Sequence, residues 1–173
     1  MPKPEIIAIA ALSASNRVIG KQGKVPWRLP EDLRRFRQLT LHHAAIVGRK
    51  TWEFDLEKCP LSDRHNIVVS SSLRSDTVAP HCRKFPFKLT FVTSFEAALQ
   101  TVANEDKAFI IGGGSLYRQA LPYCDRLELT FLEGDRTGDT FFPPYEHLIG
   151  KEFELTAIEK HAGYRFETYR RME

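Results

Sequence analysis

The chain has 173 residues, of which 42% are hydrophobic and 27% are charged, and its formal net charge is +3. These values indicate a globular protein with a substantial core and exclude a disordered or fibrous chain. The weak, spread positive charge favours anionic small molecules over nucleic acid as partners, and no apolar run approaches the length of a membrane span.

Predicted strands and helices alternate along the chain. Continuous apolar runs predict strands that are buried on both faces, and the later strands alternate more clearly. In chain order, the predicted strands are 6–12, 44–48, 66–70, 89–93, 108–111, 126–132, 152–159 and 164–170. The predicted helices are 30–39, 95–102 (capped by Ser94) and 115–121, with a helical turn at 49–53. This order predicts an α/β fold in a single domain over 1–173, with a mixed, mostly parallel central sheet, flanking helices and an antiparallel C-terminal hairpin.

The segments between these elements are polar or irregular. Residues 16–27 predict a loop because glycines interrupt them, and residues 71–87 are irregular. Cys59, Cys82 and Cys124 are odd in number and lack metal-ligand spacing, so we expect free thiols in a reducing compartment and no metal. With no signal-peptide pattern at the start, we expect a cytoplasmic protein.

The stretch 19–36 joins a glycine-bearing loop to the start of a helix. Pro30 suits the first helical turn, where Glu31 and Asp32 place negative charge that the helix dipole favours. Asp32 and Phe36 are four residues apart and share one side of the helix. Asp32 is therefore either a first-turn carboxylate that caps the helix or pairs with an arginine, or a carboxylate in an apolar cleft that binds a ligand with paired N–H donors.

Ligands of such sheets bind beyond the carboxyl ends of the strands. Three polar or glycine-rich segments lie there, at 48–51, 70–74 and 112–115. Their cations, hydroxyls and backbone N–H groups suit phosphate, although tight turns or solvated loops explain them about as well. Arg64 is either a carboxylate clamp or a surface residue. Because no nucleophile or metal constellation stands out, an enzyme with this sequence would take its reactivity from a cofactor.

Taken together, these segments resemble dihydrofolate reductase. The match follows the chain in order over residues 9–11, 17–20, 25–33, 36, 48–53, 60–64, 111–114, 117 and 138–143. The resemblance implies a monomer that reduces 7,8-dihydrofolate to tetrahydrofolate with NADPH, supports one-carbon metabolism and thymidylate synthesis, and binds antifolates.

The resemblance also implies roles for particular residues. Asp32 matches the family's active-site carboxylate, which binds the pterin 2-amino group and ring N–H, and Thr130 matches the threonine behind it. Arg64 would pair with the glutamate α-carboxylate of the substrate. The implied catalytic residues are Asp32, Trp27, Thr130 and Tyr117, and the implied substrate-binding residues are Ile9, Ala10, Asp32, Leu33, Phe36, Leu61, Arg64 and Ile111.

A second set of residues would hold NADPH. It comprises Ala11, Ile19, Gly20, Gly48, Arg49, Lys50, Thr51, Ser70, Ser71, Arg74, Gly112, Gly113, Gly114, Ser115, Leu116 and Tyr117. Residues 20–27 resemble the family's mobile loop, and its unusual cis peptide bond would fall between Gly112 and Gly113. Ser115 stands where many members have arginine, and we expect Arg74 to compensate near the 2′-phosphate. The segment 54–59 is longer and more acidic than the usual link.

Two other functions fit parts of the sequence. A related reductase of riboflavin synthesis shares the fold but acts on a ribosylaminopyrimidine, which has no glutamate tail for Arg64. A non-catalytic pterin-binding or nucleotide-binding protein would not need Asp32, Trp27 and Thr130 together.

Overall fold

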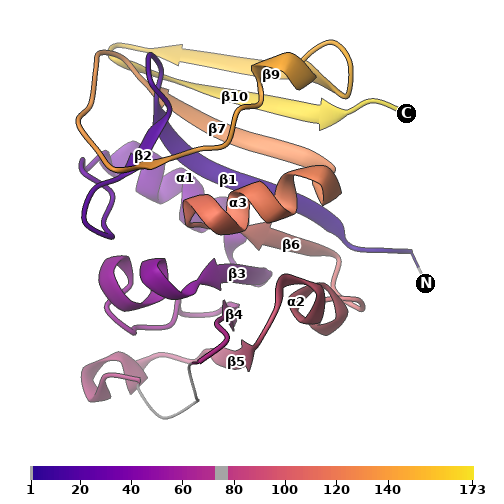
Figure 1. Cartoon of the computed structure of the whole chain (residues 1–173). Coiled ribbons are helices and arrows are strands. Elements are labelled where there is room, and N and C mark those ends of the chain that lie inside the picture. The colour runs from indigo at the N-terminus through magenta and orange to yellow at the C-terminus, as the bar shows by residue number, and fades with distance from the viewer. Residues whose placement is uncertain (1, 73–77) are drawn as a thin grey trace.

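The computed structural model describes residues 2–72 and 78–173, and in that part of the chain an eight-stranded sheet has the order β5-β4-β3-β6-β1-β7-β10-β9 (Figure 1). Its neighbours from β5 to β7 are parallel, whereas β10 is antiparallel to both β7 and β9. The predicted sheet and its C-terminal hairpin are confirmed. The strands are β1 (Glu5–Ser13), β3 (Ala44–Gly48), β4 (His65–Val69), β5 (Lys88–Val92), β6 (Lys107–Ile110), β7 (Arg126–Leu132), β9 (Phe153–His161) and β10 (Tyr164–Arg171).

The segment predicted as a loop contains a short strand. This strand, β2 (Val18–Gly20), pairs with β8 (Thr140–Phe141) in a separate two-stranded sheet. The prediction was wrong for these residues because their partner lies more than a hundred positions downstream, and a local pattern cannot show such pairing.

Helices cover both faces of the large sheet. Successive residues of β1 point to opposite faces, so Ile6 packs with the core beneath α2 (Phe95–Thr101) and α3 (Gly114–Ala120), whereas Ile7 packs with Phe36 of α1 (Pro30–Thr40). In Figure 1, α1 lies behind the sheet and α2 and α3 lie in front of it. This double cover explains the continuous apolar runs of the central strands.

The helix starts follow the predicted local chemistry. Pro30 occupies the first turn of α1, and the Ser94 hydroxyl oxygen accepts a hydrogen bond from Ala97 N at 3.1 Å, which caps α2. Short helical turns complete the set: the π-helical η1 (Thr51–Asp55) and the 3-10 turns η2 (Pro80–Lys84), η3 (Leu121–Tyr123) and η4 (Glu146–Leu148). No helix that the structure describes has the length and apolar character needed to cross a bilayer.

Polar and apolar residues alternate along strand β7, yet every one of its residues is buried. The buried charges of β7, Arg126 and Glu128, are paired in a charge cluster under α1, although Arg126 Nε makes no hydrogen bond of good geometry within the described part of the chain. The Glu128 carboxylate lies 2.6 Å from Arg35 Nη2 and 3.2 Å from Arg126 Nε, and it accepts a 2.8 Å hydrogen bond from Thr168 Oγ1. Burial is possible here because the charges are paired.

The prediction of three free thiols is wrong for two of them. Cys59 and Cys82 are joined by a disulfide, with 5.3 Å between their Cα atoms. They lie 23 residues apart on either side of β4, and folding brings the two flanking segments together. Cys124 is free and buried, and burial raises the pKa of its thiol to about 12.

Candidate active site

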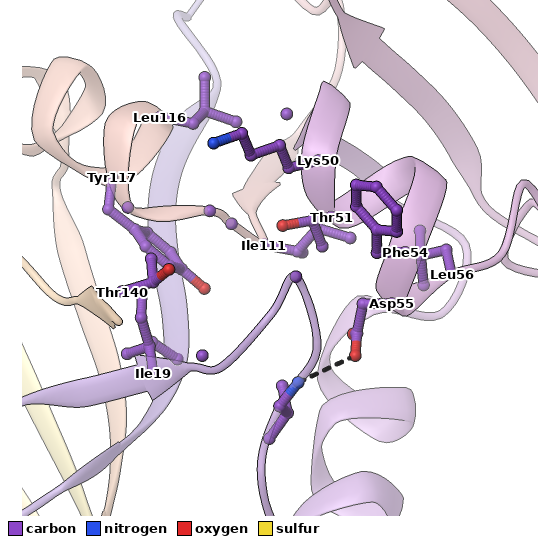
Figure 2. A pocket seen from close by; sticks show the side chains of 18 of the residues that line it. Ile19, Lys50, Thr51, Phe54, Asp55, Leu56, Ile111, Leu116, Tyr117 and Thr140 are labelled. Carbon is purple, nitrogen blue, oxygen red and sulfur yellow. Dashed lines mark hydrogen bonds between the residues drawn. The ribbon is translucent and has the colours of Figure 1, made fainter. Parts of the chain in front are cut away.

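A cleft of about 1650 Å³ opens beyond the carboxyl ends of β3, β4 and β6. Figure 2 shows part of it, with Leu116 and Tyr117 of α3 facing Lys50 and Thr51 across the space. Sites for one small ligand usually enclose roughly 300–1,000 Å³. This cleft therefore has room for two ligands side by side.

Apolar side chains that face solvent form part of the cleft wall. Val25, Leu33 and Phe54 line it and are 43%, 52% and 49% exposed. Large exposed apolar groups that gather around one concave surface mark a ligand site.

The structure brings nearly all predicted site residues to this cleft. The predicted substrate-side residues that line it are Ile9, Ala10, Trp27, Asp32, Leu33, Phe36, Leu61, Arg64 and Ile111. The predicted cofactor-side residues that line it are Ala11, Ile19, Gly20, Gly48, Arg49, Lys50, Thr51, Ser70, Ser71, Gly112, Gly113, Gly114, Ser115, Leu116 and Tyr117. Thr130 lies behind Asp32 rather than in the lining, and Arg74 falls outside the described residues.

Asp32 lies in the first turn of α1 with its carboxylate partly buried. Thr130 Oγ1, on β7, donates a hydrogen bond of 2.5 Å to Asp32 Oδ1. Burial raises the pKa of Asp32 above its usual 3.8, while the Thr130 hydrogen bond and the charge of Arg35 oppose the rise. Arg35 makes its ion pair with Glu128, so the alternative in which Arg35 is the partner of Asp32 is not observed. The geometry favours a carboxylate that faces the cleft.

Tyr117 links α3 to the first strand. Its hydroxyl donates a 2.7 Å hydrogen bond to the carbonyl oxygen of Ile9, and burial raises the pKa of Tyr117, which therefore stays neutral. This bond fixes the phenol beside the backbone of β1, at the floor of the cleft.

Glycines allow the ends of β3 and β6 to approach closely. Gly48 N donates to the carbonyl oxygen of Gly112 at 2.7 Å, and the Gly112–Gly113 peptide bond is cis, as the resemblance implied. A Cβ at Gly113 would lie 3.1 Å from Thr51 Oγ1, and one at Gly114 would lie 3.1 Å from the carbonyl oxygen of Phe141. The absence of side chains leaves a backbone cradle for a flat or phosphorylated group.

Arg64 is held in one orientation rather than lying free on the surface. It is 6% exposed, its Nη1 donates to Thr40 Oγ1 at 3.1 Å, and its Nε donates to the carbonyl oxygen of Ser62 at 2.8 Å. Burial lowers the pKa of Arg64 to about 10, so the group remains positive at neutral pH. The guanidinium is thus a pre-positioned cation at the cleft.

The side of the cleft that the predicted cofactor-binding residues line is rich in cations and hydroxyls. Arg49 Nη1 donates to Ser72 Oγ at 2.6 Å, and Arg49 Nε lies 3.0 Å from Glu53 Oε1, so the side chain is held beside the opening. With Lys50 and Thr51 next to it and the glycine cradle opposite, this surface fits a phosphorylated dinucleotide.

The sequence did not single out the contacts that hold the loop over the cleft. Val25 N donates to Asp55 Oδ1 at 3.1 Å, which is the dashed bond in Figure 2, and Gln22 N donates to Asp139 Oδ2 at 3.0 Å. Gly23 has φ +82°, and a Cβ there would lie 2.6 Å from Phe54 Cβ. The acidic character of 54–59 was the only signal that pointed to Asp55.

Comparison with known sequences identifies the family. A family model described as dihydrofolate reductase matches residues 5–171. The chain belongs to the dihydrofolate reductase family.

Several dihydrofolate reductases are similar over most of their length. The type 3 enzyme of Salmonella typhimurium is 39% identical over 153 residues, which cover 86% of this chain and 85% of the relative. The dihydrofolate reductase of Neisseria meningitidis serogroup A is 36% identical over 168 residues, covering 95% and 98%. The structure of dihydrofolate reductase from Enterococcus faecalis complexed with NADP(H) and RAB-propyl matches with a TM-score of 0.80 and 29% identity, covering 98% of this chain and 97% of that one.

The chain is accordingly an NADPH-dependent oxidoreductase. It reduces 7,8-dihydrofolate to 5,6,7,8-tetrahydrofolate by hydride transfer to C6 with protonation of N5, in support of one-carbon metabolism and thymidylate synthesis. The relatives do not favour the reductase of riboflavin synthesis.

Proposed function

We propose that Asp32 binds and orients the pterin ring of dihydrofolate for reduction. The observation that supports this role is the partly buried carboxylate at the cleft, with Oδ1 held by Thr130. A carboxylate accepts two parallel hydrogen bonds from a ring N–H and an adjacent amino group, and such charge-assisted pairs fix orientation as well as affinity. NADPH supplies the hydride when it is bound.

The other residues of the substrate side position the ring and exclude water. The backbone of Ile9 and Ala10 borders the pterin. The Tyr117 hydroxyl donates a hydrogen bond to the carbonyl oxygen of Ile9 and so holds this part of the backbone in place. Leu33 and Phe36 pack on the ring system, and Trp27, at the end of the loop 20–27, helps this loop to cover the ring. Alignment of reactants in a dry cleft lowers the barrier without a protein nucleophile.

Polar groups at the two ends of the cleft hold the tails of the ligands. Arg64 pairs with the α-carboxylate of the substrate's glutamate, which its fixed, charged guanidinium suits. Arg49, Lys50 and Thr51 hold cofactor phosphates, and Ser70 and Ser71 lie near the 2′-phosphate. Leu61 borders the benzoyl ring. Antifolates with paired donors bind the same carboxylate as the pterin.

Arg74 has a role in this proposal that rests on the resemblance alone, because it lies outside the described residues. Its cation contributes to selection of NADPH over NADH. An Arg74→Ala protein that keeps the full preference for NADPH would remove the hypothesis.

We further propose that the protein is a cytoplasmic monomer that folds as one domain over 1–173. It binds neither nucleic acid nor membranes in this proposal. The small net charge of +3 supports the absence of a nucleic-acid role. Size-exclusion chromatography with light scattering tests the monomer, because a dimer would elute at twice the mass.

The deciding experiment follows NADPH oxidation by absorbance with dihydrofolate and purified wild type or Asp32→Asn. Loss of one charge-assisted contact of roughly 3 kcal/mol lowers kcat/KM on the order of a hundredfold. NADPH binding, measured by fluorescence titration, should be unchanged and controls for misfolding. Full turnover by the variant would contradict the role of Asp32.

A further inference from the structure

We propose that Cys59 and Cys82 are a reversible thiol–disulfide site that fixes the position of the substrate-side wall of the cleft, which is the part lined by Leu56 and Leu61. The inference rests on the proposed function in one respect, namely that this wall contacts the substrate. The site lies outside the catalytic constellation, in the segments on either side of β4.

The separation of the two backbones suits a disulfide, and small molecules can reach the pair. The Cα atoms are 5.3 Å apart, within the range of roughly 4.4–6.8 Å that a disulfide spans without backbone movement. Both cysteines are half-buried and the adjacent His81 is exposed, whereas Cys124 is fully buried. Reagents in solution can therefore reach the pair but not the third thiol.

A histidine supports exchange chemistry at this pair. His81 Nε2 lies 3.7 Å from Cys59 Sγ, close enough to accept the thiol proton or to stabilise the thiolate that attacks a disulfide. The same three residues bring their ligand atoms within 4.8 Å of one another, so a soft cation is the competing occupant. These three residues offer one ligand fewer than the four that a structural zinc site usually has, and the 5.3 Å between the two Cα atoms lies in the disulfide range, so we favour the disulfide.

The cross-link is coupled to the cleft through short hydrogen-bonded steps. Cys59 N donates to the carbonyl oxygen of Leu56 at 2.9 Å, and Lys58 N donates to that of Trp52 at 2.9 Å, so Cys59 continues the turn that begins at η1. Leu56 and Leu61, on either side of Cys59, both line the cleft. The disulfide thus ties this wall to η2.

The reaction is a balanced exchange with a low-molecular-weight disulfide such as oxidised glutathione. The Cys59 thiolate attacks one sulfur of that disulfide, which releases one glutathione thiolate and leaves a mixed disulfide. The Cys82 thiolate then displaces the second glutathione and forms the internal bond. The protein loses two protons and two electrons, and the co-reactant becomes two thiols.

The test compares protein equilibrated in reduced and in oxidised glutathione. Alkylation and intact mass should show Cys59 and Cys82 free after reduction and bonded to each other after oxidation. Reduction should lower Tm by on the order of 5 °C and raise KM for dihydrofolate roughly threefold or more. His81→Asn should slow oxidation.

Matched variants separate the cross-link from general damage. Cys59→Ser and Cys82→Ser should show the reduced-state Tm and KM in both buffers, while Cys124→Ala should respond as wild type does.

Three results would overturn the inference. The first is that, in oxidised glutathione, each thiol carries glutathione and the internal bond does not form. The second is that reduced protein given Zn²⁺ alone retains one equivalent of Zn²⁺. The third is that KM for dihydrofolate is identical in the two buffers. Loss of all turnover in both buffers would instead count against the proposed residue roles. The cross-link would still be tested in that case, because intact mass after alkylation and Tm both report it without any activity measurement.

Discussion

Thr130 on β7 and Asp32 on α1, 98 residues apart, are joined by a hydrogen bond of 2.5 Å between Oγ1 and Oδ1. The bond occupies one oxygen of the carboxylate, and among the described residues no hydrogen bond is made to the other. It also counteracts the effect of burial on the pKa of the carboxylate. The charge state of Asp32 therefore depends on a residue that does not itself line the cleft.

Replacement of Thr130 with valine should raise the pKa of Asp32 in the free protein, because the hydroxyl stabilises the charged form. A carbon-13 NMR titration of the carboxyl group measures this directly. Thr130→Ser keeps a hydroxyl and is the matched control. An unchanged pKa in Thr130→Val would show that the hydrogen bond does not set the charge state.

Asp32→Asn should make the free protein more stable than wild type at neutral pH. The folded-state pKa of Asp32 is raised, so the native state binds more protons and wild-type stability falls as pH rises from 3.8 through the folded pKa. The amide has no such penalty and can still accept from Thr130. Thermal unfolding should show a higher Tm for the variant at pH 7 and no gain below pH 3.8; a lower Tm at pH 7 would contradict the sign.

Arg64→Lys should raise KM for dihydrofolate about tenfold or more, because an ammonium cannot reproduce the fixed, forked geometry of the guanidinium. Steady-state kinetics with a dihydropterin that lacks the glutamate is the internal control, and its KM should not change. Equal losses with both substrates would assign Arg64 a structural role instead.

Asp55→Ala should speed release of bound ligand up to about tenfold, since it removes the acceptor that holds Val25 N of the loop. Asp55→Asn keeps an acceptor oxygen and should behave like wild type. Stopped-flow fluorescence of NADPH displacement measures the rate. Identical rates in all three proteins would mean that this contact does not limit loop opening.

Glu128→Gln should destabilise the fold by about 3 kcal/mol, because it leaves the buried Arg126 and the half-buried Arg35 without the carboxylate that they share. Urea denaturation measures the loss. Glu152→Gln, which removes the exposed partner of Arg171, is the matched control and should cost less than about 1 kcal/mol. Similar costs for both would argue against the buried cluster.

The order and type of the main elements could be predicted from local sequence patterns. Apolar runs such as 108–111 marked central strands because helices cover both sheet faces, and Ser94 marked a helix start because its side chain satisfies a free backbone N–H. The segments at strand ends also indicated the cleft, since parallel strands bring their carboxyl ends to one edge.

Local patterns could not predict which residues far apart in the sequence are in contact in the fold. Val18 pairs with Phe141, Cys59 meets Cys82, and Glu128 gathers charges from α1 and β7. Asp32 illustrates the difference. Its position in the first turn of the helix followed from local chemistry. Whether it pairs with Arg35 could not be predicted locally, because Arg35 forms its ion pair with Glu128, a residue distant in sequence. Local sequence patterns reflect interactions between residues that are close along the chain. Strand pairing, side-chain burial and pKa values depend instead on residues that are close in space.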